Sequence, residues 1–417
     1  MRENARPTHS ASGFDVLAII SLLANMHIKN FTAILKVAEI CNIDCDYCYY
    51  YNIGDESWRE YPPYMDDETM QLIIRRLREL AQTHKVDVFR LVLHGGEPMM
   101  AKVDRLTSFV TRAREQLAEL ATVQFAIQTN GTILSPEWLS FFETNRITVG
   151  VSIDGPAEAH DQHRRTKQGK PTHKAVETFL STCGSLAEKK RLHRLGTITV
   201  IDRALDVPRT VAYLQCQPGL SGMSFVMPDN EVNNILFNRA TAVEYASTLI
   251  DIYNANVLER RIRNKEVLKF MSKLQPGNDE PKGVEGEIEY VGVTIQSNAL
   301  MKVNEELIAT GSWRKSFPSA DLRITAVVSY LQSSAFSEYL RYTDRLPSKC
   351  EGCKWANVCR GGSMQERRNP TNGFNERSVF CESYQQLYDY MFADLVRHGY
   401  PEEKLRERLL LQSATVA

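Results

Sequence analysis

Three cysteines within eight residues are the feature of this chain that carries the clearest chemistry. Cys41, Cys45 and Cys48 are spaced C-x3-C-x2-C, and no fourth cysteine lies beside them. A cubane iron–sulfur cluster normally takes four Cys thiolates. Three thiolates therefore leave one iron open to a small molecule, just as a catalytic zinc keeps one position free. The alternative interpretation is a zinc knuckle that lacks its fourth ligand.

A second group of cysteines lies near the C-terminal end. It consists of Cys350, Cys353, Cys359 and Cys381. Four thiolates can hold zinc tetrahedrally or ligate a four-iron cluster, and the spacing leaves both interpretations open. The two remaining cysteines, Cys183 and Cys216, fall in predicted helices, where we expect them to be small buried apolar side chains.

The predicted fold is α/β, with helices alternating with short apolar runs. The runs cover residues 31–37, 86–93, 123–127, 147–153, 195–201 and 223–227, and the helical periods cover residues 66–82, 104–121, 136–143, 173–190, 207–216 and 240–259. Six such repeats predict a parallel sheet with outer helices. Because a full barrel has eight units, we expect an open, partial (βα)6 barrel, whose lateral mouth could admit a polypeptide.

Polar and glycine residues follow the first four of these strands, where loops meet at one face of a parallel barrel. Beside the cysteine loop they include Gly95, Gly96, Glu97, Asn130, Ser152 and, a little further on, Arg164. The two glycines let the backbone come close to a ligand. Ser152 offers a hydroxyl, and Arg164 offers a fork suited to a carboxylate. Taken one at a time, each stretch could equally be a turn that opens a helix.

These motifs, in this order, resemble the radical S-adenosylmethionine (SAM) enzymes that modify peptides and proteins. The resemblance implies a SAM-binding [4Fe–4S] cluster on the three N-terminal cysteines, with Tyr47 stacked on the adenine of SAM. It also implies that the Gly-Gly-Glu motif binds the methionyl amino group, and that Ser152 and Arg164 contact the ribose and the carboxylate. The SAM contacts implied are Tyr47, Gly95, Gly96, Glu97, Asn130, Ser152 and Arg164.

The tail resembles the SPASM or twitch-like extension, which carries auxiliary iron–sulfur clusters beside such a barrel. The usual run there is C-x2-C-x5-C-x3-C with a distant last cysteine and two more upstream. Here Ser363 stands where the fourth cysteine of the run would fall, and no cysteine lies between Cys216 and Cys350. The resemblance therefore implies one auxiliary [4Fe–4S] cluster, fully ligated by the four tail cysteines, that transfers electrons or supports the structure.

Residues 372–381, together with residues 359–362 and 302–305, sharpen the resemblance toward maturases that build cyclophane or ether crosslinks in ribosomal peptides, the darobactin-like maturases among them. It implies a 5′-deoxyadenosyl radical that takes a side-chain hydrogen from a ribosomal precursor peptide, followed by a crosslink to an aromatic residue. A flavodoxin- or ferredoxin-type protein would supply one electron at a time. No residue stands out as the general base.

Two alternatives remain open. One is a radical SAM enzyme that forms formylglycine from Ser or Cys, or a thioether; such enzymes usually carry more auxiliary cysteines than this chain. The other belongs to a different class, a non-catalytic adaptor that holds zinc at both sites.

We expect five regions along the 417 residues. They are an N-terminal extension at 1–28, the barrel at 29–260, a bridging region at 261–345 with a hairpin of strands 288–296 and 300–303, the auxiliary-cluster region at 346–384, and a C-terminal segment at 385–417 with one helix over about 382–411.

Charge and cysteine usage indicate the surroundings of the protein. The net charge is −1 and the pI about 6.8, so no basic field draws the chain to nucleic acid. Thiolate ligands favour a reducing compartment, so we expect the cytoplasm and no membrane partner. Residues 14–26 resemble the core of a signal peptide, but the run is short, Asp15 interrupts it and no cleavage site follows. We expect a docking helix there, or a natural start at Met26.

Overall fold

The structure is a computed structural model that describes residues 27–52, 56–229, 243–275, 287–303, 307, 317–367 and 373–410. The apolar segment at 14–26 and the start proposed at Met26 lie outside these residues. None of the helices in the described ranges is both long enough and apolar enough to span a bilayer.

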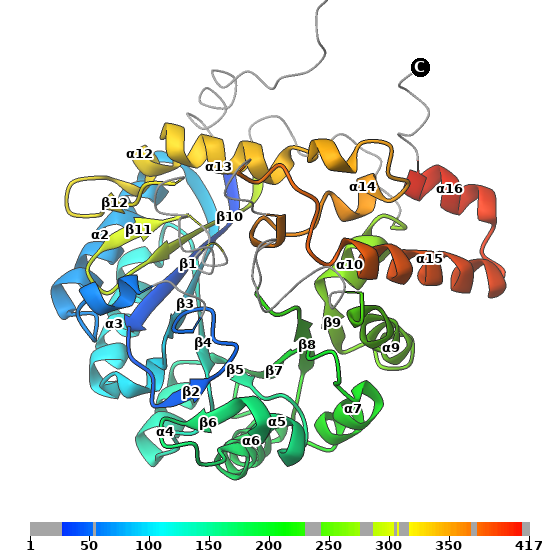
Figure 1. The fold of residues 1–417 in the computed structure, drawn as a ribbon. Helices are drawn as coiled ribbons and strands as arrows, with labels where there is room; N and C mark the ends of the chain where they lie inside the picture. Colours follow the sequence, from blue (N-terminus) through cyan, green and yellow to red (C-terminus); the bar gives the residue numbers. More distant parts are fainter. Residues whose placement is uncertain are drawn as a thin grey trace, which may run out of the picture.

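One curved sheet forms the body of the molecule (Figure 1). Its strand order is β12-β11-β10-β1-β3-β4-β5-β7-β8-β9, and the run from β10 to β9 is parallel throughout. The strands are β1 (His27–Ala38), β3 (Lys85–Gly95), β4 (Thr122–Thr129), β5 (Thr148–Ser152), β7 (Arg194–Val200), β8 (Gly222–Val226), β9 (Ile262–Asn264), β10 (Glu287–Ile295), β11 (Leu300–Lys302) and β12 (Ala320–Asp321).

Helices lie outside the curve of the sheet, between successive strands (Figure 1). They are α2 (Asp67–Thr83), α3 (Val103–Leu117), α4 (Pro136–Thr144), α5 (Ala157–His163), α6 (His173–Glu188), α7 (Val207–Gln215) and α9 (Tyr245–Leu258). Several begin at a side-chain cap, as where Asp66 accepts a hydrogen bond from the Thr69 amide at the start of α2. The six predicted repeats are all present, which confirms the partial parallel barrel.

The predicted hairpin is confirmed, because β10 and β11 pair antiparallel. However, β10 also pairs in parallel with β1, so the barrel sheet continues directly into the bridging region. The paired residues, such as His27 and Glu287, are 260 positions apart, and no local pattern predicts a pairing over that separation.

A second, two-stranded sheet was not predicted. It pairs β2 (Ile43–Cys45) antiparallel with β6 (Arg164–Thr166) and joins the cysteine loop to the segment after α5. Each strand has only three residues, too few to show a period of two.

The C-terminal part packs beside α9, with α15 against that helix (Figure 1). Its helices are α10 (Lys265–Ser272), α12 (Val327–Leu331), α13 (Ser334–Asp344), α14 (Ala356–Cys359), α15 (Cys381–Arg397) and α16 (Glu402–Leu410). Short 3-10 turns cover Ser348–Cys350 and Gln365–Arg367 in this part, and Ser57–Glu60 and Pro98–Met100 in the barrel.

Two sequence predictions are wrong. The single C-terminal helix is two helices, because Gly399 at φ 89° and the following Pro401 end α15 before α16 begins. Cys183 is fully buried in α6 as expected, but Cys216 is exposed at the C-terminal end of α7.

Candidate active site

A cavity of about 230 Å³ lies at the C-terminal ends of the barrel strands. Nine of the predicted site residues line it: Cys41, Cys45, Tyr47, Cys48, Gly95, Gly96, Asn130, Ser152 and Arg164. They come from the cysteine loop after β1, which includes β2, from the last residues of β3 and β5, from the segments that follow β3 and β4, and from β6. The parallel strands therefore bring together residues that lie more than 100 positions apart in the sequence.

Hydrogen-bond donors surround the cysteine loop. Asn130 Nδ2 lies 3.6 Å from Cys41 Sγ, and Arg164 Nη1 lies 3.8 Å from Cys45 Sγ. Burial raises the pKa of the Cys41 thiol to about 11 and that of the Cys45 thiol to about 12. A bound metal deprotonates a coordinating thiol outright, and N–H donors then stabilise the negative sulfur.

These three thiols fit the open-iron cluster predicted from their spacing, because all of them line one cavity and two have such donors. Within the described residues, no three His, Cys, Asp or Glu side chains converge on a point as they would around a single metal ion.

The two glycines of the second motif allow a close backbone contact. The Gly96 amide donates to the Ala38 carbonyl at 2.8 Å, and the Glu97 amide donates to the Ile40 carbonyl at 2.8 Å. A Cβ on Gly96 would overlap the Ile40 carbonyl and the Tyr51 hydroxyl. The end of β3 therefore holds the stretch that leads from β1 into the cysteine loop, and a larger residue would push the two apart.

The side chain of Glu97 does not line the cavity. It is fully buried and accepts hydrogen bonds from the amides of Met99 and Asn130, at 2.9 and 2.7 Å, and from the Thr129 hydroxyl at 2.8 Å. Burial raises the pKa of this carboxyl to about 7, against those hydrogen bonds. In this structure Glu97 positions Asn130, while its predicted contact with SAM stays a prediction.

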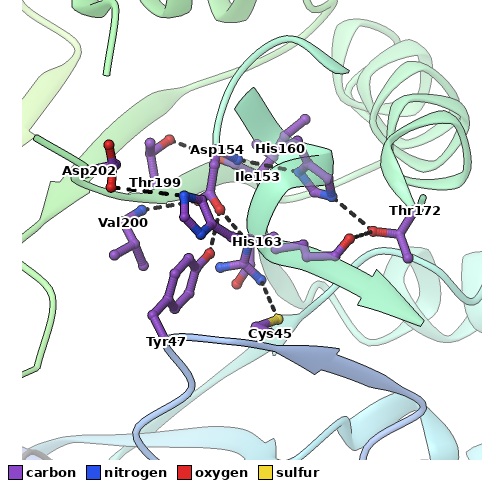
Figure 2. A network of polar contacts seen from close by, with 12 residues as sticks. Cys45, Tyr47, Ile153, Asp154, His160, His163, Thr172, Thr199, Val200 and Asp202 are labelled. Carbon is purple, nitrogen blue, oxygen red and sulfur yellow. Dashed lines mark hydrogen bonds and ion pairs between the residues drawn. The ribbon is translucent and has the colours of Figure 1, made fainter. Parts of the chain in front are cut away.

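Asp154 is a central residue that the sequence reasoning treated only as part of a turn. Its Oδ2 accepts from Arg164 Nε at 3.0 Å. The same oxygen accepts from the Tyr47 hydroxyl, and Oδ1 accepts from the Val200 amide at 3.1 Å (Figure 2). The Asp154 carboxylate is 3% exposed, so these partners stabilise a buried charge. It fixes the orientation of both Tyr47 and Arg164, the two predicted SAM contacts beside the cysteine loop.

His160 contacts the main chain of Asp154. Its Nδ1 lies 3.4 Å from the Asp154 amide and its Nε2 lies 3.0 Å from the Thr172 hydroxyl (Figure 2). Burial, with the positive charge of Arg164 nearby, lowers the pKa of His160 to about 3, so the ring stays neutral.

Asp229 is a second residue that the sequence reasoning missed. Among the described residues that line the cavity, it is the only carboxylate. It follows β8 by three residues, so the available signal was an acidic residue just after the sixth predicted strand. The titratable His94 also lines the cavity, with Nδ1 3.4 Å from the ammonium of the buried Lys36.

The four tail cysteines come together, as predicted. Cys350, Cys353, Cys359 and Cys381 line one small cavity of about 20 Å³. Gln385 Nε2 lies 3.8 Å from Cys353 Sγ and 3.7 Å from Cys381 Sγ, and Trp355 and Tyr384 form part of the wall. Four thiols around one enclosed space, with an amide donor beside two of them, fit a cluster ligated by protein alone. Ser363 does not line this cavity.

Comparison with known proteins agrees with this geometry. Residues 35–196 match the family model of the Radical SAM superfamily. The chain is 20% identical over 364 residues to a cysteine-type anaerobic sulfatase-maturating enzyme of Clostridium perfringens, covering 85% of this chain and 94% of the relative. A serine-type anaerobic sulfatase-maturating enzyme of Bacteroides thetaiotaomicron is 38% identical over 146 residues, covering 34% of this chain and 33% of the relative.

The fold has a counterpart among solved structures. Native anSMEcpe with bound AdoMet and Kp18Cys peptide aligns with a TM-score of 0.70 at 18% identity, covering 88% of this chain and 99% of that one. The matched region lies in the partial parallel barrel and carries the three-cysteine loop at its strand ends, which is the fold and motif of radical SAM enzymes. Such enzymes use SAM and a [4Fe–4S] cluster, which Cys41, Cys45 and Cys48 would hold here, and the tail cysteines would hold an auxiliary cluster.

Proposed function

We propose that this radical SAM enzyme oxidises the side chain of a Cys or Ser residue in a peptide or protein to formylglycine. The observation that carries the proposal is the similarity to sulfatase-maturating enzymes over 85% of this chain, combined with the cysteine-lined cavity at the barrel strand ends. A related fold has been solved with both AdoMet and a peptide bound, which supports a peptide as the substrate.

Each part of the cavity has a role in this chemistry. When bound, SAM and its cluster supply the one-electron cleavage that removes a hydrogen atom from the substrate carbon. Tyr47 and Arg164, held by Asp154, orient SAM against the cysteine loop. The barrel wall excludes water from the reacting centre.

The oxidation must also dispose of a second hydrogen. Converting a serine CH2–OH group to an aldehyde removes two hydrogens; one leaves as an atom, and the other leaves as a proton and an electron. For cysteine the same loss gives a thioaldehyde, which water then hydrolyses to the aldehyde with release of hydrogen sulfide. Asp229, the carboxylate on the cavity wall, accepts the proton. The four tail cysteines would hold an auxiliary cluster, which would supply a one-electron acceptor, and an external one-electron carrier would take the electron on.

The test is turnover of matched peptides by the anaerobic, iron-reconstituted protein with SAM and a reductant. Peptides that differ only in a central Cys, Ser or Ala should show an aldehyde, trapped with a hydrazide, for Cys or Ser and none for Ala, with one 5′-deoxyadenosine formed per aldehyde. Formation of 5′-deoxyadenosine without any aldehyde would overturn the assignment.

A second candidate is a cyclophane or ether crosslink in a ribosomal precursor peptide, which one observation favours. The tail brings together four cysteines, and Ser363 occupies the position of the next expected cysteine. Enzymes that form formylglycine usually carry more auxiliary cysteines than this chain, which favours the crosslink. A crosslink also removes two hydrogens but leaves no aldehyde. Tandem mass spectra of the product, in which a crosslinked segment fails to fragment, separate the two candidates.

A further inference from the structure

Three polar side chains beside the cysteine loop form a closed ring of hydrogen bonds. Asn130 Nδ2 donates to Asn42 Oδ1 at 2.9 Å, and Asn42 Nδ2 donates to the Thr132 hydroxyl at 2.8 Å. The Thr132 hydroxyl in turn donates to Asn130 Oδ1 at 2.6 Å, which closes the ring. Asn42 directly follows a predicted cluster ligand, and Asn130 lies 88 positions further along the chain, just after β4. The ring therefore joins the cysteine loop to another strand end.

A main-chain amide fixes the direction of every bond in this ring. The Thr132 amide lies 2.9 Å from Asn130 Oδ1, and a main-chain N–H can only donate, so the atom that it meets must be the side-chain oxygen. The side-chain nitrogen of Asn130 then points the other way, toward Asn42. Neither asparagine can flip without bringing two donors or two acceptors face to face.

The other N–H of Asn130 Nδ2 is donated to sulfur. Its distance to Cys41 Sγ is 3.6 Å. An asparagine side chain has two N–H donors on its nitrogen and two acceptor positions on its oxygen. Here the donors go to Asn42 and Cys41, and both acceptor positions go to Thr132. This amide, on a residue only 7% exposed, therefore has no position left for SAM, although the resemblance implies SAM as its partner.

A hydrogen bond to a cysteine ligand changes the electron affinity of the cluster that the cysteine holds. An N–H group stabilises the extra negative charge of the reduced form, so such a bond raises the reduction potential. A carbonyl oxygen has the opposite effect, and Asn42 Oδ1 lies 4.0 Å from the same Cys41 Sγ. Because the ring pairs Asn42 Oδ1 with Asn130 Nδ2, this oxygen is compensated and an N–H is presented to the sulfur.

We propose that Asn42 and Thr132 are positioning residues that hold the Asn130 amide with its nitrogen toward Cys41, and that this raises the reduction potential of the cluster on the barrel cysteines. The Asn130 side chain acts on the ligand sulfur and not on SAM. Because the cluster must be reduced before SAM is cleaved, the ring makes the first electron easier to accept. The inference rests on Cys41 as a cluster ligand and is independent of which peptide residue is modified.

The test is an anaerobic redox titration of the iron-reconstituted protein, without peptide, followed by electron paramagnetic resonance. The signal that changes when SAM is added belongs to the barrel cysteines, because that cluster has an open iron. Asn130→Asp keeps the size of the side chain but replaces its N–H groups with a carboxylate oxygen. We expect reduction of this cluster to become about tenfold less favourable, which is about 59 mV for a one-electron couple.

Variants of Thr132 test the ring without adding charge. Thr132→Val removes the hydroxyl and should make reduction about threefold less favourable, whereas Thr132→Ser keeps the hydroxyl and should retain the wild-type potential. The dissociation constant of SAM, from equilibrium dialysis with the oxidised protein, should be unchanged in both. The matched controls, Thr178→Val in α6 and Asn254→Asp in α9, lie outside both cysteine-lined cavities and should keep the wild-type potential.

Three results would overturn the inference. The first is the same potential in wild type and Asn130→Asp. The second is equal potentials in Thr132→Val and Thr132→Ser, and this pair decides the question if Asn130→Asp takes up no iron. The third is weaker SAM binding by Thr132→Val at an unchanged potential, which would assign the ring to SAM. A protein that shows the expected shifts but modifies no peptide would instead overturn the proposed function and leave this inference standing.

Discussion

At the residue scale, a small set of side chains holds the cysteine loop ready for a metal cluster. Asn130 and Arg164 direct N–H groups at two of the three sulfurs, and Asp154 ties Arg164 and Tyr47 together. Burying the charge of Asp154 costs little free energy only while all three of its hydrogen-bond donors are present. Substitutions in this group therefore act on the loop as well as on the group they remove.

Replacing Cys41 with alanine should abolish SAM cleavage, because two thiolates cannot hold the cluster with one open iron. The measurement is 5′-deoxyadenosine formed from SAM and dithionite, with iron content determined on the same sample. Cys183→Ala is the matched control: this cysteine is buried in α6 away from the cavity, so iron and cleavage should both remain. Cleavage by Cys41→Ala would disprove the assigned role.

Replacing Asp229 with asparagine should separate SAM cleavage from product formation. The amide keeps the shape of the side chain but cannot accept a proton, so product formation should fall about a hundredfold or more while iron content and uncoupled SAM cleavage persist. Asp202→Asn is the control, because Asp202 follows β7 but does not line the cavity. Unchanged product yield from Asp229→Asn would show that another group is the base.

His160 should make the protein less stable in mild acid. Its pKa is about 3 when folded and near 6.5 when unfolded, so between these values the unfolded chain binds the extra proton. Stability is therefore lost as pH falls from about 6.5 toward 3, by about 2 kcal/mol at pH 5.

In the variant His160→Gln, this loss of stability on acidification should be absent. The check is the thermal unfolding midpoint of both proteins at about pH 7 and pH 5. The raised pKa of Glu97 acts in the opposite direction but is common to both proteins, so it cancels in the difference. Parallel pH dependences would contradict the role of His160.

At the element scale, strand ends and the short β2–β6 sheet position the loops. The end of β3 contacts the segment after β1 through two main-chain hydrogen bonds, and β6 pairs with the strand that contains Cys45. These contacts extend the pairing of β1 with β3 into the loops and join the cysteine loop to the segment after α5, so the geometry of the site depends on close backbone packing.

Gly96→Ala tests that packing. The added methyl meets main-chain atoms of Ile40, which cannot rotate away, so we expect a loss of about 1–3 kcal/mol in stability and a lower iron content. Gly222→Ala in β8 is the control, since its Cβ meets only the Arg261 carbonyl at 3.7 Å, an ordinary contact. Thermal unfolding and iron analysis measure both. A variant of Gly96 with full iron and unchanged midpoint would show that the contact is not needed.

At the scale of the whole molecule, the barrel and the tail form two separate cysteine sites. Because the two cysteine sites are separate, we expect the auxiliary cluster to be lost without loss of the barrel cluster. Cys381→Ala should lose the auxiliary cluster and the iron it holds, while SAM cleavage is at least partly kept, because the barrel cysteines are untouched. Cys216→Ala, an exposed cysteine outside both sites, should keep all its iron. Unchanged iron in Cys381→Ala would contradict its role as a ligand.

The amino-acid sequence by itself determined the three-thiolate loop, the order of the strand-end motifs, the six βα repeats and the four tail cysteines. These features are local: ligands within a few residues, or periodic patterns along one element, need no distant partner to be recognised. The break between α15 and α16 could also have been predicted from the sequence, because Gly399 and Pro401 are themselves signals that end a helix.

Only the tertiary structure decided which side chains meet. Asp154 receives Tyr47 from 107 positions away, Asp229 touches Gln365 across 136 positions, and Ser363 meets Lys265 across 98. Such contacts arise because parallel strands bring all their C-terminal ends to one face and because the tail folds back on the last of them. A pattern along the chain specifies what each residue can do, whereas the partners of each residue are fixed by how the sheet curves and how the tail packs against it.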